Sequence, residues 1–404
     1  MEIRTLFDKT NNDRIDDAAI VRFVAPRSYT GENIVEFHTH GGRAVVAALL
    51  GALGRLPGLR PAEPGEFTRR AVEAGRLDLT RAEAIADLVD AETDAQRRQA
   101  LRQLSGQLAE LYENWRKRLI AAAAWLEAAI DFSEEEEDVP ADAAERSRAE
   151  VSTVLEEIQR HLDDGRRGEI LRDGVHVAVL GPPNAGKSSL VNTLTRRDVA
   201  IVSEIAGTTR DLIEVRLDLK GFPVILSDTA GLREAGLREG GLRDAIGPIE
   251  GEGVRRARAR GEAADIRILL LDGAISRPDH DFGVKPDITV YNKADLVEPA
   301  CRREGLWIST KTGEGIGALI DHLARQAEAK VDRPGEAAVL TRARHRRALE
   351  DAARALSGAW PGGGQPELAA ENIRIALHAI GRITGRVDLD ELLDVVFRDF
   401  CIGK

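Results

Sequence analysis

The chain contains 404 residues, which at roughly 150 residues per domain is enough for two or three domains with separate cores. Its 57 lysine and arginine residues against 68 aspartate and glutamate residues leave a net charge of −11, which excludes a generally basic nucleic-acid coat protein. The two cysteines, Cys301 and Cys401, are too few for a disulfide framework or a cysteine zinc site, so we expect a reducing, cytoplasmic setting. No apolar stretch reaches the ~20 residues that a membrane span needs.

The first two predicted domains differ in amino-acid composition and in the spacing of their apolar residues. Residues 1–75 mix short alternating apolar runs with glycine and proline, which predicts a small α+β domain. Residues 76–170 are rich in Ala, Leu, Glu and Arg. Apolar residues recur three or four positions apart over 101–130, which predicts one long amphipathic helix, and a second helix is predicted over 151–162. We therefore expect 76–170 to be the first part of a helical domain.

The texture changes again in residues 171–331, where apolar runs alternate with helical and glycine-bearing segments. This alternation predicts an α/β domain with a largely parallel sheet. Helical texture returns in residues 332–404, so we expect the α/β domain to be inserted into one helical domain. The predicted strands are 175–180, 224–226, 266–271, 288–291 and 306–308, and the later helices are 341–356, 368–384 and 389–400.

A phosphate-binding motif follows the first of these strands. Gly181-Pro-Pro-Asn-Ala-Gly-Lys-Ser188 matches the pattern G-x-x-x-x-G-K-[ST] and stands between an apolar strand and the helix-like segment 189–194. In such a loop the backbone N–H groups around Gly186 surround the phosphates, Lys187 adds a positive charge, and Ser188 offers its hydroxyl to Mg²⁺. The sequence therefore predicts a nucleotide-binding site.

Three further motifs stand at the ends of predicted strands and favour a guanine nucleotide. In Asp228-Thr-Ala-Gly231, a carboxylate can reach Mg²⁺ through water and a glycine N–H can meet the γ-phosphate. In Asn292-Lys-Ala-Asp295, the acceptor-only carboxylate of Asp295 suits the adjacent N–H donors of guanine. Ser309-Thr-Lys311 would add a backbone contact to the guanine oxygen. The order of the motifs is that of small GTPase domains, so we expect GTP.

The loop at 203–211 supplies the remaining element of a GTPase. A loop threonine can close onto Mg²⁺ when the γ-phosphate is present, and we expect Thr209 to be that ligand. Many GTPases carry a water-orienting glutamine after Gly231, but here the position is Leu232, which neither donates nor accepts a hydrogen bond. Hydrolysis therefore requires another group, from the chain, an ion or a partner. The residues predicted to bind GTP are Asn184, Ala185, Gly186, Lys187, Ser188, Ser189, Ser203, Glu204, Ile205, Ala206, Gly207, Thr208, Thr209, Asp228, Thr229, Ala230, Gly231, Asn292, Lys293, Ala294, Asp295, Ser309, Thr310 and Lys311.

Motifs along nearly the whole chain resemble those of the tRNA-modification GTPase family MnmE, also called TrmE. They include Tyr29-Thr-Gly-Glu, Pro64-Gly-Glu-Phe-Thr, Ala82-Glu-Ala-Ile-Ala-Asp-Leu, Ala206-Gly-Thr-Thr-Arg-Asp and the most specific, the terminus Phe400-Cys-Ile-Gly-Lys404. The resemblance implies an N-terminal folate-binding dimerisation domain, followed by a helical domain into which a P-loop GTPase domain is inserted. It also implies a homodimer that forms a heterotetramer with the flavoprotein MnmG (GidA). Together they would modify the C5 position of the wobble uridine of tRNA with a carboxymethylaminomethyl or aminomethyl group.

The resemblance implies an answer to the missing glutamine, because the family hydrolyses GTP when two G domains meet with K⁺ bound. Glu250 matches the family's water-orienting glutamate; Glu252 is the alternative, since a five-residue Gly-Leu-Arg-Glu repeat lengthens the preceding loop. The predicted catalytic residues are Glu250, Lys187, Thr209 and Cys401. Cys401 is included because it resembles a family cysteine that is linked to the modification step. For Cys401 a plain structural thiol is the alternative. The oxygen ligands implied for K⁺ are Asn184, Ser203, Ile205 and Thr208.

The chain also departs from the family. Glu36, Arg76 and Lys404 match positions that contact a 5,6,7,8-tetrahydrofolate derivative, but Arg76 stands where the family usually has lysine. The chain begins inside the family's first domain, so we expect that domain to be truncated. Only fourteen residues separate Asp272 from Asp287, too few for the full helix normally found there.

The sequence is compatible with two other functions. One is a GTPase switch in ribosome assembly or RNA binding without modification chemistry, against which the terminal motif and the segment 64–67 argue. The other is a nucleotide-binding protein that does not turn over its nucleotide, because of the altered switch region and the incomplete first domain.

Overall fold

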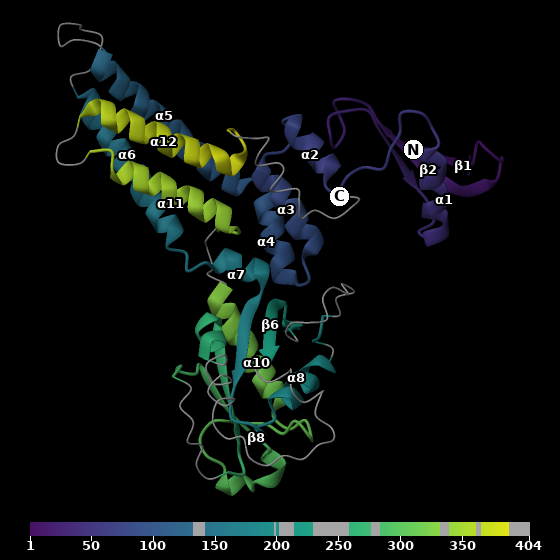
Figure 1. The fold of residues 1–404 in the computed structure, drawn as a ribbon, viewed down its shortest axis with the longest axis vertical. Coiled ribbons are helices and arrows are strands. Elements are labelled where there is room, and N and C mark those ends of the chain that lie inside the picture. Colours follow the sequence, from purple (N-terminus) through teal and green to yellow (C-terminus); the bar gives the residue numbers. More distant parts are fainter. Residues whose placement is uncertain are drawn as a thin grey trace, which may run out of the picture. The chain divides into compact units, whose positions relative to one another are not determined.

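The computed structural model describes residues 1–131, 142–197, 199–201, 214–228, 258–275, 283–331, 339–360 and 365–387 (Figure 1). The chain divides into two compact units. Unit 1 comprises Met1–Val89, Leu101–Arg160 and Arg344–Lys404, and unit 2 comprises Asp90–Ala100 and His161–Ala343.

Unit 1 begins with a three-stranded antiparallel sheet. Its strands, in the order β1-β2-β3, are β1 (Glu2–Phe7), β2 (Arg14–Phe23) and β3 (Ile34–His38), and the helices α1 (Arg43–Gly54) and α2 (Glu66–Glu73) follow. Among the strand residues only Ala18 is buried, and α1 buries none of its side chains. Ile3 and Leu50 are 77% and 62% exposed, so within the described part of the chain this segment leaves much of its own apolar surface open to solvent.

The remaining helices of unit 1, and α4 (Asp94–Leu104), whose residues up to Ala100 are assigned to unit 2, arise from the predicted apolar periodicity, with one correction. The single helix expected over 101–130 is two helices, α4 and α5 (Gln107–Asp131). The break lies at Gly106, whose φ of +95° is a left-handed conformation that ends a helix. The periodicity does not reveal the break because apolar residues continue at three- and four-residue spacing through it.

Helices from both ends of the chain build this unit. α3 (Leu79–Asp90), α5 and α6 (Ala143–Leu162) precede the large sheet in sequence, and α11 (Ala343–Ser357) and α12 (Pro366–Thr384) follow it. Figure 1 shows α5 and α12 side by side, in agreement with their direct packing. The buried residues of these two helices include Tyr112, Trp115, Leu119, Leu126, Ile373, Ala376, Ile380 and Ile383.

The other helix predictions of this unit agree with the structure where it describes the chain. The stripe predicted for α6 is Val151, Val154, Leu155, Ile158 and Leu162; the structure buries Val151, Val154 and Ile158 and half-buries the other two. The helices expected over 341–356 and 368–384 are α11 and α12, and the helix expected over 389–400 lies outside the described residues. None of the described helices is both long and apolar enough to span a membrane.

Unit 2 is built on a six-stranded sheet in the order β5-β6-β4-β7-β8-β9. All neighbouring strands run parallel except β5 and β6, so the predicted parallel α/β sheet is confirmed. The sequence analysis missed the antiparallel edge strand β5, although its side chains alternate in burial as a half-covered strand requires. The strands are β4 (Val175–Leu180), β5 (Glu214–Leu219), β6 (Phe222–Asp228), β7 (Ile266–Asp272), β8 (Ile288–Asn292) and β9 (Leu306–Trp307).

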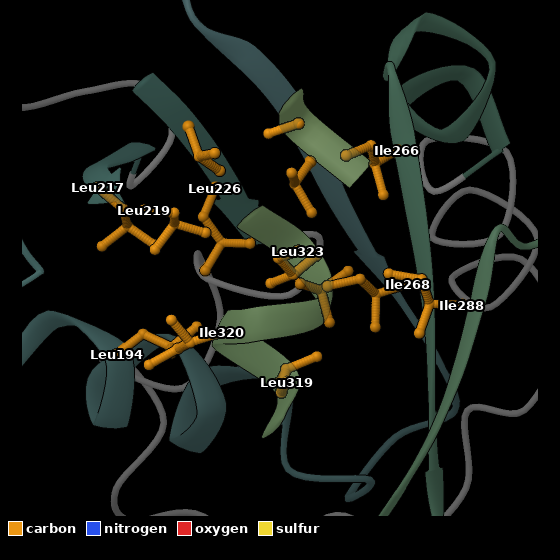
Figure 2. Close-up of a cluster of buried hydrophobic side chains, with 14 of the residues drawn as sticks. Leu194, Leu217, Leu219, Leu226, Ile266, Ile268, Ile288, Leu319, Ile320 and Leu323 are labelled. Carbon is orange, nitrogen blue, oxygen red and sulfur yellow. The ribbon is translucent and has the colours of Figure 1, made fainter. Parts of the chain in front are cut away.

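The larger apolar core of unit 2 lies on one face of this sheet, and the alternate β4 residues Ala178 and Leu180 form a smaller buried cluster with Ala264. Figure 2 shows side chains from β5, β6, β7 and β8 meeting side chains from α8 (Lys187–Thr195) and α10 (Ile316–Val331). Leu194, Leu226, Ile268 and Leu319 are each 0% exposed. The apolar core fixes the strands, and the loops at their carboxyl ends are placed where a ligand binds in an open parallel sheet.

Candidate guanine-nucleotide site

The predicted phosphate loop joins β4 to α8 and has the shape of an anion cradle. Gly186 is the N-cap of α8 with φ +96°, and Asn184 has φ +64°, so the loop turns sharply into the helix. A Cβ on Gly186 would clash with Asn292 Nδ2, and one on Gly181 would clash with the Leu270 carbonyl oxygen. Because the backbone is bare, the positive end of α8 is open to a phosphate group.

The side chains of the loop have the predicted placement. Ser188 and Ser189 lie in the first turn of α8, and Ala185 is fully buried beneath the loop. Lys187 Nζ donates hydrogen bonds to the carbonyl oxygens of Gly181 and Pro182, both at 3.0 Å. Its ammonium group therefore lies within the loop, where a polyphosphate would meet it.

Asn292 connects the phosphate loop to the two loops that are predicted to read the base. Its Nδ2 donates to the Ala185 carbonyl oxygen at 2.9 Å, and its Oδ1 accepts from the N–H of Lys293 at 2.8 Å and of Thr310 at 3.2 Å. The side chain is 1% exposed, so its amide bonds are shielded from water. The structure thus brings the phosphate loop together with two motifs that lie more than a hundred residues further along the chain.

The carboxylate predicted to read guanine is held at the surface by its neighbours. Ser309 Oγ donates to Asp295 Oδ1 at 2.6 Å. This hydrogen bond, aided by the charges of Lys311 and Lys293 and opposed by partial desolvation, lowers the pKa of Asp295 below its ordinary value. The side chain is therefore an ionised acceptor at neutral pH, as guanine N–H donors require.

Sequence reasoning missed the acidic partner of Lys293. Lys293, at φ +65°, forms an ion pair with Asp272 at 2.5 Å, and the side chain of Asp272 is 11% exposed. The available signal was that Asp272 ends β7, the strand next to β8, so that both carboxyl ends meet at one edge. Ala294, which follows Lys293 in the chain, is buried.

The structure describes only some of the remaining predicted residues. Asp228 ends β6 opposite Val179 of β4, which places its backbone beside the strand that leads into the phosphate loop. The structure does not describe its side chain. The predicted residues that lie outside the described part of the chain are Ser203, Glu204, Ile205, Ala206, Gly207, Thr208, Thr209, Thr229, Ala230, Gly231, Glu250, Glu252, Cys401 and Lys404.

Of the two described folate candidates, one lies in a strand of the three-stranded sheet and the other in the turn between α2 and α3. Glu36 is in β3, and its carboxylate lies 3.1 Å from His38 Nε2. Arg76 follows α2; its Nη2 donates to the Ser28 carbonyl oxygen at 3.3 Å, and its side chain packs on Gly31.

Comparison with known proteins places this arrangement in a family. A family model described as the MnmE helical domain matches residues 79–401, and one described as the GTP-binding protein TrmE N-terminus matches residues 1–76. The chain belongs to the MnmE family. The resemblance predicted from its motifs is thereby confirmed.

Curated members of the MnmE family align over nearly the whole chain. The "tRNA modification GTPase MnmE" of Parvibaculum lavamentivorans is 54% identical over 98% of this chain and 89% of its own length. The protein of the same name from Rhodospirillum rubrum is 54% identical over 96% of this chain and 85% of its own length. A solved G domain of the T. maritima FeoB iron transporter is 24% identical over 38% of this chain and 98% of its own; its TM-score of 0.26 is too low to support a conclusion.

Proposed function

We propose that this chain is a GTP hydrolase that acts in tRNA modification. The GTPase activity and the role in tRNA modification follow from membership of the MnmE family. The observation that carries the nucleotide choice is the chain of contacts from the phosphate loop through Asn292 to Thr310, beside the ionised Asp295. These contacts place the loop that would hold the phosphates and the carboxylate that would accept from guanine in one site.

In this proposal the chain's own residues bind and orient GTP. The backbone around Gly186 and the Lys187 ammonium group hold the phosphates, and Asp295 holds the base. Ser188 and Thr209 would hold Mg²⁺, and Asp228 would reach it through water; the ion neutralises phosphate charge. The bare backbone at Gly186 and the hydroxyl of Ser188 in the first turn of α8 fit such a group.

We further propose that hydrolysis is stimulated by K⁺ when two G domains meet. Leu232 cannot orient water, so an added cation near the phosphates and a glutamate, Glu250 or Glu252, would supply the missing stabilisation. Asn184 is exposed and left-handed in the phosphate loop, which leaves its side-chain oxygen on the surface for a hard cation. Ser203, Ile205 and Thr208 would complete the ligand shell.

The tRNA chemistry proposed for this chain is modification of the C5 position of the wobble uridine. The protein would act in the cytoplasm as a homodimer that forms a heterotetramer with the flavoprotein MnmG. Cys401 would take part near the modification step. Glu36, Arg76 and Lys404 would contact a tetrahydrofolate derivative. The proposed domains are 1–75, 76–170, 171–331 and 332–404, with the third inserted into the helical domain; the packing of α5 against α12 supports this arrangement.

The K⁺ proposal is tested by GTP hydrolysis with Mg²⁺, in KCl and in NaCl at equal ionic strength. We expect a large preference for K⁺ that Asn184→Ala removes and that Asn192→Ala, an exposed asparagine of α8, leaves unchanged. Equal, slow rates in both salts would reject the K⁺ site.

The tRNA proposal is tested by nucleoside analysis of tRNA from cells that lack the protein. We expect loss of the modified wobble uridines, restored by the wild-type chain but not by Lys187→Ala. Unchanged uridines would instead favour a GTPase switch without modification chemistry.

A further inference from the structure

Arg302 contacts both loops that are assigned to guanine. Its Nη2 donates to the carbonyl oxygen of Ala294 at 3.0 Å, inside the loop 292–295. Its Nη1 donates to Glu314 Oε1 at 2.6 Å. Glu314 belongs to the turn that begins at Ser309, because the Ser309 N–H donates to the Glu314 carbonyl oxygen at 2.9 Å. One guanidinium therefore joins the two loops directly.

The same guanidinium is fixed by two other contacts. Its Nε donates to the Val297 carbonyl oxygen at 3.3 Å, and its central carbon lies 5.7 Å from the centre of the Trp307 ring. Trp307 in turn stacks on Tyr291, with 5.0 Å between ring centres and 25° between planes. The Arg302 side chain is only 20% exposed, which shields its bonds to the backbone carbonyl oxygens, whereas the Glu314 side chain is 46% exposed.

The stacked rings of Tyr291 and Trp307 also connect the two strands that lead into these loops. Tyr291 directly precedes Asn292, and Trp307 stands two positions before Ser309, so each ring belongs to the strand that ends in a base-reading loop. A Cβ on Gly273 would clash with the Trp307 ring, which shows how tightly the indole is seated. Arginine suits this position because its planar fork donates in several fixed directions and stacks on an aromatic face.

We propose that Arg302 is a positioning residue for guanine selectivity: by tying Ala294 to Glu314, it holds Asp295 and the loop 309–311 at the separation that guanine requires. Asp295 accepts from both the ring N–H and the exocyclic amine of guanine. A shift of the Asp295 carboxylate relative to the base therefore weakens the binding of guanine more than that of hypoxanthine, which lacks that amine. This inference rests on the proposed placement of guanine at Asp295.

The test measures the affinities of the purified full chain for GDP and for inosine diphosphate. Arg302→Met keeps the length of the side chain but removes its donors, and we expect the ratio of the two affinities to fall about tenfold. Arg302→Lys and Glu314→Gln should lower the ratio by a smaller factor, because each removes part of the link. Arg325→Met, at an exposed arginine of α10, is the matched control and should keep the wild-type ratio.

The ratio separates positioning from general stability. A lower melting temperature with an unchanged ratio in Arg302→Met would overturn the proposal, since a merely structural residue moves both affinities equally. If Arg302→Met does not fold, the ratio of GDP to inosine diphosphate affinity is measured in Arg302→Lys and Glu314→Gln instead. A lower ratio in these variants supports the proposal, and an unchanged ratio overturns it. If the wild-type chain binds both nucleotides equally, the placement of guanine at Asp295 is wrong, and the inference about Arg302 falls with it.

Discussion

Glu83 in α3 accepts two hydrogen bonds from the guanidinium of Arg344 in α11, at 2.6 and 2.8 Å, although 261 positions separate the two residues. His345 Nε2 lies 2.8 Å from the same carboxylate, and Arg344 also donates to the Ile383 carbonyl oxygen in α12 at 3.0 Å. Burial would raise the pKa of Glu83, but the charges of Arg344 and His345 outweigh it and hold that pKa well below its usual range. The cluster fastens helices from the two ends of the chain.

Glu83→Gln should destabilise unit 1 by about 3 kcal/mol, because it leaves the charge of Arg344, whose side chain is only 23% exposed, without its counter-ion. The measurement is the urea midpoint of the helical transition, followed by far-UV circular dichroism. Glu127→Gln is the matched control: Glu127 pairs with Arg374 at 2.7 Å, but the two side chains are 46% and 59% exposed. We expect it to cost less than about 1 kcal/mol, and equal losses in the two variants would contradict a special role for the buried cluster.

Gly186→Ala should weaken GDP binding about 100-fold, because the residue has φ +96° and its Cβ would clash with the Asn292 amide. Gly317→Ala, in α10, is the control; a Cβ there meets no atom within 4 Å, and alanine favours a helix. Isothermal titration with GDP compares the two. A Gly186→Ala chain that binds GDP normally would show that the phosphates do not occupy this loop.

Asp295→Asn should exchange guanine for xanthine as the preferred base. The carboxylate accepts from the adjacent N–H donors of guanine, whereas an amide also donates and so suits the carbonyl oxygen that xanthine carries in place of the amine. We expect about a 100-fold loss of GDP affinity together with a gain for xanthosine diphosphate, measured by competition. Loss of both nucleotides without a switch would argue against direct base contact by Asp295.

The first segment of the chain should lose a stabilising contact in acid. The hydrogen bond from Arg60, with those from the Glu63 N–H and Arg70, lowers the pKa of Glu66 from its ordinary 4.5 to about 2. Because the folded pKa is the lower one, this carboxylate stabilises the fold above pH 4.5 and loses that effect as the pH falls toward 2. The difference in melting temperature between the wild type and Glu66→Gln should narrow over that range. A difference that stays constant with pH would show that ionisation of Glu66 is irrelevant.

Short patterns predicted the strands of the large sheet well, and they failed where one residue changes the backbone direction. The apolar run over 175–180 coincides with β4, because a buried parallel strand needs only consecutive apolar residues. The break at Gly106 went unpredicted, since glycine tolerates both helical and left-handed conformations and the apolar spacing continues past it. β5 was missed although its sequence Glu-Val-Arg-Leu-Asp-Leu alternates polar and apolar residues, which is the pattern of a half-covered strand.

The sequence by itself determined the family to which the chain belongs, and it predicted a phosphate loop and an acidic base reader at Asp295. These signals are local, because the groups that meet one part of a nucleotide lie within a few residues of each other. The tertiary structure decided which distant groups support them: Asn292 beneath the phosphate loop, Arg302 between the base-reading loops and Glu83 against Arg344. Such partners depend on how strands and helices pack, and packing is set by contacts between residues far apart in the chain, which no local pattern records.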